Sequence, residues 1–314
     1  MGGAVVMRVA VGHGAAPYRG NSSLSRGGAC LILPAMPELP EVETVARGLA
    51  QVWDGRRFVS VETRRAGLRV PFPKDFARRL TGRTVEAVGR RAKYLVVRLD
   101  GGLVMLGHLG MSGRMTIGAL RNEPPGPHDH VEWVTDQGIS VTLTDPRRFG
   151  LFALCEASDL GGHPLLAGIG PEPLDEAFDA GVLAKALAGK TGPIKTVLLD
   201  QKVVAGLGNI YVCESLFRAE ISPLRPAGSL SRAEVGRLVP LIKAVLSEAV
   251  AAGGSTLRDH ARPDGELGYF QHSFQVYGRE GETCPGCPGA PACGGILRMT
   301  QAGRSTFYCA KRQR

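Results

Sequence analysis

Residues 205–209 read Ala-Gly-Leu-Gly-Asn, and they join two segments in which apolar residues recur at helical spacing, 193–202 and 209–219. A glycine pair that follows a helix rather than a strand does not fit a dinucleotide-binding loop. The glycines allow a tight turn, and its amides and the positive N-terminus of the next helix are suited to binding a phosphate. We expect Asn209 to cap that helix or to donate to the phosphate itself. A helical hairpin with a purely structural role is the alternative.

Helical patterns continue on both sides of this turn. Segments 176–188 and 231–252 show the same apolar spacing, so we predict a helical domain over residues 176–274. Before it, residues 156–175 are rich in glycine and proline and show no periodicity, which is typical of a linker.

The preceding part of the chain has a different period. One helix is predicted over 37–51, and it is followed by short apolar or alternating segments separated by turn residues. These strand segments are 58–63, 85–88, 94–99, 103–106, 131–134 and 139–143. Many short strands at this spacing favour a β-sandwich or a barrel, which we assign to residues 36–155. The predicted fold class is therefore α+β.

Four of the seven cysteines lie in the last 31 residues, Cys284, Cys287, Cys293 and Cys309. Two cysteine pairs on a β-hairpin would bind zinc tetrahedrally, but Arg312 stands where a fourth cysteine is expected. Cys293 is the nearby thiol that completes the set, so we predict one structural zinc ion per chain, in a zinc-finger hairpin over 275–314. The alternative is that Cys293 is a bystander and the finger binds metal weakly or not at all.

The first 35 residues contain three arginines and seven glycines but no acidic residue. They lack the apolar core of a secretory signal and the amphipathic period of a transit peptide. We interpret residues 1–35 as a disordered or misannotated extension.

The chain carries a formal net charge of +9, which favours a polyanion such as nucleic acid as the partner. No apolar run reaches the length of a membrane-spanning helix, so we expect no membrane association. An odd number of cysteines without a secretory signal indicates a reducing compartment.

Taken together, the motifs resemble the formamidopyrimidine-DNA glycosylase (MutM) family over about residues 36–312. The matching stretches are Pro37-Glu-Leu-Pro-Glu-Val-Glu-Thr, Arg90-Arg-Ala-Lys-Tyr, Gly107-His-Leu-Gly-Met-Ser-Gly, His128-Asp-His, Thr144-Asp-Pro-Arg-Arg-Phe-Gly, Gly170-Pro-Glu-Pro-Leu, Gly206-Leu-Gly-Asn-Ile-Tyr, Gly268-Tyr-Phe, Val276-Tyr-Gly-Arg and Gly303-Arg-Ser-Thr-Phe-Tyr-Cys. The resemblance implies an N-terminal β-sandwich domain, a helix-two-turn-helix domain and a C-terminal zinc finger. It also implies a bifunctional glycosylase/lyase that excises 8-oxoguanine and formamidopyrimidines from double-stranded DNA by a proline Schiff base and β,δ-elimination. With the resemblance we expect a monomer in the bacterial cytoplasm that is associated with the nucleoid through DNA.

The resemblance also assigns roles to residues. Pro37 resembles the N-terminal proline nucleophile of the family, and Glu38 resembles its acid/base residue. Lys93 matches the lysine of β-elimination, and Arg304 matches the arginine of δ-elimination and phosphate binding. The positions that match DNA contacts are His128, Arg147, Lys190 and Asn209, together with Met111 and Phe149, which with Arg147 fill the space left by a flipped-out base.

Two other functions stay open. An endonuclease VIII-like enzyme for oxidised pyrimidines typically opens with Pro-Glu-Gly-Pro-Glu, whereas residue 39 here is Leu. A catalytically silent, zinc-dependent DNA-binding protein would result if Pro37 stayed blocked. While Met36 is attached, the Pro37 nitrogen is a tertiary amide and cannot act as a nucleophile. We therefore expect the active enzyme to begin at Pro37, after initiation at Met36 and removal of that methionine.

Overall fold

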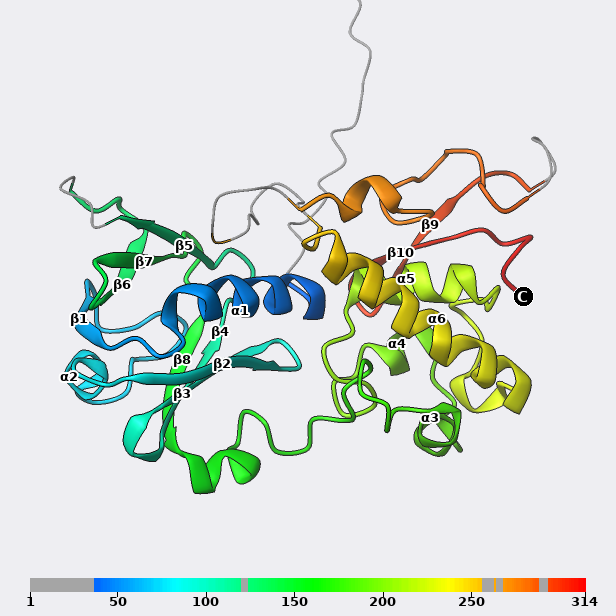
Figure 1. Cartoon of the computed structure of the whole chain (residues 1–314). Coiled ribbons are helices and arrows are strands. Elements are labelled where there is room, and N and C mark those ends of the chain that lie inside the picture. The colour runs from blue at the N-terminus through cyan, green and yellow to red at the C-terminus, as the bar shows by residue number, and fades with distance from the viewer. Residues whose placement is uncertain (1–36, 120–123, 256–262, 264–267, 288–292) are drawn as a thin grey trace, which may run out of the picture. The chain divides into compact units, whose positions relative to one another are not determined.

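The computed structural model describes residues 37–119, 124–255, 263, 268–287 and 293–314. The predicted extension over residues 1–35 lies outside the described residues. Within them, the N-terminal part consists of a long helix, a short helix and two four-stranded antiparallel sheets (Figure 1). The helices are α1 (Leu39–Trp53) and α2 (Phe76–Leu80). The first sheet has the order β1 (Phe58–Thr63), β6 (Asp129–Thr135), β7 (Ile139–Thr144), β5 (Arg114–Ala119). The second has the order β2 (Val85–Arg91), β3 (Tyr94–Leu99), β4 (Leu103–His108), β8 (Leu151–Glu156).

The two sheets share one apolar core, which makes this part a β-sandwich. The ring of Trp133 in β6 lies 5.6 Å from that of Phe152 in β8, and 5.7 Å from that of Trp53 in α1. The predicted sandwich is confirmed, although β5, β8 and α2 were not predicted. A short turn that begins at Asp136 joins β6 to β7, which pair antiparallel.

Helix α1 contributes to two cores. A capping box fixes its start, in which the Glu41 carboxylate accepts a hydrogen bond from the Glu38 amide at 3.0 Å. Leu39, at the beginning of the helix, is buried in the core of the helical domain. Val42 through Trp53 bury their apolar face in the core of the sandwich. The first turn of α1 therefore belongs to one domain and the rest of the helix to the other.

The helical domain contains four α-helices among the described residues. They are α3 (Ala180–Leu187), α4 (Ile194–Leu198), α5 (Asn209–Arg218) and α6 (Arg232–Ala251). Each predicted helical segment contains one of them, and α4 is shorter than predicted because turns occupy residues 199–205. Helix α6 begins with a capping box between Ser231 and Glu234.

The C-terminal part is a hairpin of β9 (Leu297–Gln301) and β10 (Arg304–Tyr308) (Figure 1). Ala302 and Gly303 both have positive φ, as a two-residue hairpin turn requires. Ile296 and Phe307 are buried in the same core as the helical domain. The hairpin therefore packs on that domain as one structural unit.

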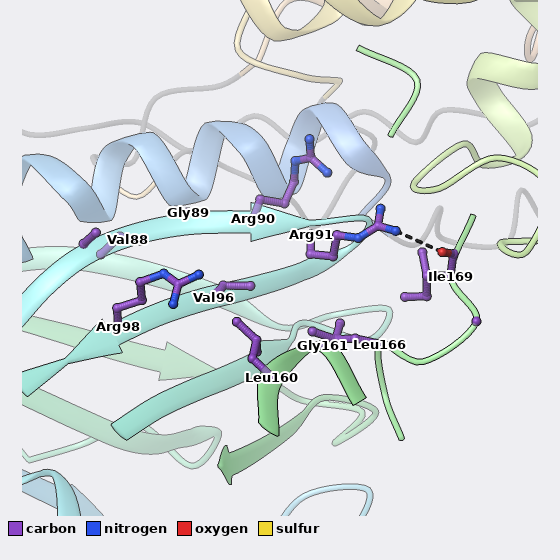
Figure 2. Close-up of a pocket in the computed structure, with 12 residues that line it drawn as sticks. Val88, Gly89, Arg90, Arg91, Val96, Arg98, Leu160, Gly161, Leu166 and Ile169 are labelled. Carbon is purple, nitrogen blue, oxygen red and sulfur yellow. Dashed lines mark hydrogen bonds between the residues drawn. The ribbon is translucent and has the colours of Figure 1, made fainter. Parts of the chain in front are cut away.

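The predicted linker contains a short 3-10 helix, Ala157–Gly162, and it is tied to β2. Arg91 donates to the carbonyls of Ile169 and Gly170 at 3.0 and 2.6 Å. A pocket of about 570 Å³ lies beside this contact, between β2–β3 and the segment around Leu160 (Figure 2). None of the predicted site residues lines this pocket. Among the described residues, no helix combines the length and the apolar character needed to cross a membrane.

Phe58→Ala is expected to lower the free energy of unfolding by about 3–5 kcal/mol, because the Phe58 ring is fully buried beside Trp53. Urea denaturation followed by Trp fluorescence measures the change. Val59→Ala is the matched control, since the adjacent side chain is 46% exposed and its loss should change stability by no more than about 0.5 kcal/mol. Equal effects of the two substitutions would contradict this assignment of the core.

Candidate active site and cysteine cluster

The buried carboxylate of Glu38 joins α1 to α5. Its Oε1 accepts a hydrogen bond from the Ile210 amide at 3.0 Å, and its Oε2 accepts one from the Tyr211 amide at 3.5 Å. These amides belong to the first turn of α5, where N–H groups have no partner within the helix. The helix dipole favours a negative charge at this position. The amides that the sequence offered to a phosphate therefore bind a carboxylate of the same chain in this structure.

The glycines of residues 205–209 make this contact possible. A Cβ atom on Gly208 would lie 2.2 Å from the Glu38 carboxyl carbon, and one on Gly206 would lie 2.7 Å from the Leu39 side chain. The N-cap of α5 is Gly208, so the prediction that Asn209 caps this helix is wrong. The Asn209 amide group instead donates to the carbonyl of Ser305 at 2.9 Å, which links α5 to the hairpin.

Lys93 lies on the β2–β3 turn and is buried. Its ammonium group donates to the carbonyl of Leu207 at 3.4 Å, in the same glycine-bearing turn. The turn itself is held by Glu172, which accepts from the Ala92 amide at 2.6 Å and from Arg90 at 2.7 Å. Ala92 has a φ of 52°, a strained value for a residue with a side chain, so the contacts of Glu172 stabilise an unfavourable turn.

The charges of this site act on one another. Burial raises the pKa of Glu38 to about 7, while the positive charge of Lys93 and the two helix amides oppose the increase. Burial lowers the pKa of Lys93; the charge of Glu38 raises it, and the nearby charge of Arg304 lowers it. Arg304 begins β10 immediately after the hairpin turn. The structure thus brings together Glu38, Lys93 and Arg304, which are far apart in the sequence.

Pro37 directly precedes this cluster and is buried. Its carbonyl is bonded to Glu38, whose amide is fixed by Glu41. The position of residue 37 is therefore determined by α1 and by the carboxylates that surround its first turn.

Met111, Arg147 and Phe149 lie on two neighbouring loops of the sandwich. The Arg147 guanidinium lies 4.9 Å from the centre of the Phe149 ring, which is 42% exposed. A Cβ on Gly110 would lie 2.4 Å from the Phe149 carbonyl carbon, so the loops touch through their backbones. The buried Asp145 carboxylate accepts from the Ser112 hydroxyl at 2.5 Å and from the Gly150 amide at 2.9 Å. It therefore ties the two loops together.

Two further predicted DNA contacts are exposed, and one of them adjoins these loops, because the His128 carbonyl accepts a hydrogen bond from the Asp145 amide at 3.0 Å. His128 is exposed before β6, and its ring lies 6.4 Å from that of His130. Lys190 is exposed in the turn between α3 and α4, where its backbone carbonyl accepts from the Gly228 amide.

The thiols of Cys284, Cys287, Cys293 and Cys309 converge beside the hairpin. Their four sulfur atoms lie within 4.8 Å of one another, and those of Cys287 and Cys309 are 3.6 Å apart. In a tetrahedral zinc–thiolate centre with Zn–S bonds of about 2.3 Å, neighbouring sulfur atoms are about 3.8 Å apart. The four residues therefore fit a metal ion of this kind.

Comparison with known proteins places these features in one family. The sequence models of the formamidopyrimidine-DNA glycosylase N-terminal domain and H2TH domain match residues 36–152 and 169–261. The formamidopyrimidine-DNA glycosylase of Rhodospirillum rubrum is 59% identical over 281 residues, which cover 89% of this chain and all of the relative. That of Acidiphilium cryptum is 55% identical with the same coverage.

The chain belongs to the formamidopyrimidine-DNA glycosylase family. It is therefore a DNA glycosylase of base excision repair, and AP lyase activity is typical of the family.

Solved structures agree with this assignment. The wild-type enzyme of Lactococcus lactis, in complex with DNA containing N7-benzyl-Fapy-dG, is 34% identical with a TM-score of 0.80, over 88% of this chain and all of that chain. The enzyme of Thermus thermophilus is 40% identical with a TM-score of 0.77, over 88% of this chain and 98% of that chain.

The structure of this glycosylase adds residues that the sequence did not single out. Lys195 of α4 is fully buried and donates to the Ser305 carbonyl at 3.0 Å and to the Thr306 hydroxyl at 2.6 Å. Glu41 accepts from the Tyr211 hydroxyl at 2.5 Å and from the Ser255 amide at 2.8 Å. Glu41 lies within the motif Pro37–Thr44, which marks it in the sequence, whereas no neighbouring pattern marks Lys195.

Glu38→Gln is expected to stabilise the protein relative to the unsubstituted chain, increasingly so as the pH rises from 5 to 8. The buried carboxyl group has a pKa of about 7, above its ordinary value of 4.5, so the native state holds a proton that the unfolded state loses in this range. Glu38 therefore contributes a loss of stability of about 3 kcal/mol to the unsubstituted protein as the pH rises, and a neutral glutamine contributes none. Urea denaturation at a series of pH values measures the difference.

Glu176→Gln is the control, because Glu176 is exposed and its substitution should give a stability difference that does not follow the same pH range. A difference between Glu38→Gln and the unsubstituted protein that is constant from pH 5 to pH 8 would contradict the environment described for Glu38.

Proposed function

We propose that this glycosylase excises 8-oxoguanine opposite cytosine, and formamidopyrimidines, from double-stranded DNA, and then cleaves the strand by β,δ-elimination. The observation that carries the proposal is the convergence of Glu38, Lys93 and Arg304 beside residue 37, with α5 amides on the Glu38 carboxylate. The Lactococcus lactis neighbour is in complex with DNA that contains N7-benzyl-Fapy-dG, which supports the choice of lesion.

The proposed nucleophile is the secondary amine of Pro37, freed by removal of Met36. Its lone pair attacks C1′ of the damaged nucleotide, the bond from C1′ to the base breaks, and the base leaves with the bonding electrons and takes up the proton that the nitrogen loses. The C1′–O4′ bond then breaks as the nitrogen and C1′ form the iminium ion. This divides one difficult displacement into two easier steps.

Glu38 is the proposed proton donor to O4′ during ring opening. A carboxyl group with a pKa of about 7 is protonated in a substantial fraction of molecules near neutral pH, as a general acid requires. Its two helix amides hold the group in one orientation and accommodate the carboxylate that remains after the proton has moved.

Lys93 and Arg304 are the proposed residues of the elimination steps. Loss of a proton from C2′ of the iminium intermediate expels the 3′ phosphate, and a second elimination expels the 5′ phosphate. Lys93, whose pKa is lowered by burial, is suited to the first step. Arg304 is exposed at the hairpin turn and is suited to binding a phosphate.

The remaining contacts proposed for DNA follow from the resemblance to the family, and the exposure of His128, Arg147 and Lys190 supports them. Met111, Arg147 and Phe149 would fill the space that the flipped-out nucleotide leaves, because the loops that carry them are fixed by Asp145. His128, Lys190 and Asn209 would bind the backbone of the DNA. All catalytic groups come from one chain, which supports a monomer, and the named relatives are bacterial, which supports action on the DNA of the cytoplasm.

We also propose that Cys284, Cys287, Cys293 and Cys309 hold one structural zinc ion per chain. The four-sulfur geometry supports it. Zinc would supply folding free energy to the loop between β9 and the helical domain, and no step of the chemistry passes through it.

Borohydride should trap a covalent adduct between Pro37 and DNA containing 8-oxoguanine when the protein begins at Pro37, and not when it retains residues 1–36. The reason is that only the free secondary amine can form an iminium ion for borohydride to reduce. Both proteins are prepared, their N-termini are confirmed by mass, and adduct formation is compared on gels.

Equal trapping by protein proven to retain residues 1–36 would refute the proposed nucleophile. A duplex containing an oxidised pyrimidine serves as the second substrate, since preference for it would indicate the endonuclease VIII-like alternative. Tight DNA binding without an adduct in either form would indicate the silent DNA-binding protein.

Cys293→Ser should reduce bound zinc from one ion per chain to a small fraction and should weaken DNA binding, because three thiolates cannot complete the tetrahedron. Cys155→Ser is the control, because Cys155 lies in β8 and not in the cysteine cluster. Metal content is measured by mass spectrometry of the purified proteins. Full zinc occupancy in the Cys293→Ser protein would show that the ligand set is wrong.

A further inference from the structure

Arg312 stands where a fourth finger cysteine is expected, and its side chain reaches the other cysteine-bearing segment. The Arg312 Nη1 donates to the carbonyl of Gly286 at 2.8 Å. Gly286 lies between Cys284 and Cys287 in the chain, and a Cβ on it would lie 2.5 Å from the same nitrogen. The guanidinium therefore packs directly against the backbone between these two cysteines.

Two groups of the helical domain hold the same guanidinium. Its Nη2 lies 2.9 Å from Oε1 of Glu220, the second residue after α5. Its carbon lies 5.2 Å from the centre of the Phe217 ring, in the last turn of α5. Arginine suits this position because its planar group binds two acceptors at once while a face stacks on an aromatic ring.

We propose that Arg312 is a positioning residue that joins segments 284–287 and 309–312 without metal. In a finger with two cysteine pairs, a metal ion makes this connection through the last cysteine. Here the two tasks of that cysteine are divided, because Cys293 supplies the sulfur atom and Arg312 supplies the connection between segments. The connection between the two segments rests on the contacts of Arg312 alone. Its effect on metal binding rests in addition on the proposed zinc site.

Preorganisation follows from this arrangement. Ligands that are held near their final positions lose less conformational entropy when an ion binds. Cys309 is also held from the C-terminal side, since its amide donates to the Gln313 side chain at 2.9 Å. Arg312 should therefore slow the release of the ion and keep both segments ordered after it has left.

The test compares Arg312→Met, which keeps a long side chain without donors, with Arg312→Lys and Arg314→Met. Arg314→Met is the matched control. It also removes one positive charge, but the Arg314 side chain is exposed and lies two residues after Arg312 in the chain. Full-length proteins are depleted of zinc with a chelator, depletion is confirmed by metal analysis, and hydrogen exchange is measured over peptides containing residues 282–287 and 309–314.

In zinc-free protein, both peptides of Arg312→Met should exchange about tenfold faster than those of the unsubstituted chain, which corresponds to about 1.4 kcal/mol. Arg314→Met should match the unsubstituted chain, and Arg312→Lys should fall between them because it keeps the charge but not the planar group. In zinc-loaded protein, transfer of zinc to a chromogenic chelator should be about tenfold faster for Arg312→Met, by the same conversion.

The proposal would be overturned if zinc-free Arg312→Met and zinc-free unsubstituted protein exchanged at equal rates. It would also be overturned if the zinc-free unsubstituted protein lost all protection from exchange in both peptides. Zinc content is a separate readout. If the chain binds no zinc but the exchange difference holds, the zinc site fails and the connection through Arg312 stands.

Discussion

A carboxylate with almost no access to solvent, that of Glu38, is held on the first amides of α5, and much of the site depends on how it is accommodated. Burial opposes the ionised form, whereas the amides of Ile210 and Tyr211 and the charge of Lys93 favour it. The result is a group that titrates near neutrality. The contact also requires glycine at position 208, since any side chain there would occupy the volume of the carboxylate. The glycine-bearing turn over residues 205–209, which resembles a phosphate-binding loop, therefore binds the Glu38 carboxylate of the same chain.

The architecture could largely be predicted from the sequence, because its apolar residues show the two-residue period of strands and the 3.6-residue period of helices. The alternating segments became the strands of the sandwich, and the 3.6-residue pattern gave α3, α5 and α6 close to their bounds. The strand β8 was missed because it immediately follows the motif that ends at Gly150. The strand β5 was missed because its alternation of polar and apolar residues covers only Arg114–Ile117 and stops at Gly118. Asn209 was wrongly predicted as the N-cap because asparagine is a favoured residue type at that position. The cap is Gly208, because the Glu38 carboxylate lies where a side chain at residue 208 would be.

The site could be predicted only through the resemblance to a family. No local sequence pattern predicts that three residues on separate elements interact through their charges. These are Glu38 at a helix start, Lys93 on a strand turn and Arg304 on a distant hairpin. Their proximity depends on the packing of three separate elements, and contacts of that kind leave no period in the sequence. Lys195 illustrates the limit, since its burial against Ser305 and Thr306 is decided entirely by tertiary structure.

Helix α1 has its first buried residue in one core and the rest of its apolar face in the other. Cutting the chain within residues 156–175 would thus not yield two independent modules, although that segment has the composition of a linker. A fragment ending there would expose Leu39 and leave the Glu38 carboxylate without its amide donors, and the complementary fragment would lose the anion on α5. Separately expressed halves would have to reassemble before either could carry the chemistry, so the repair enzyme is indivisible at the boundary where its two domains meet.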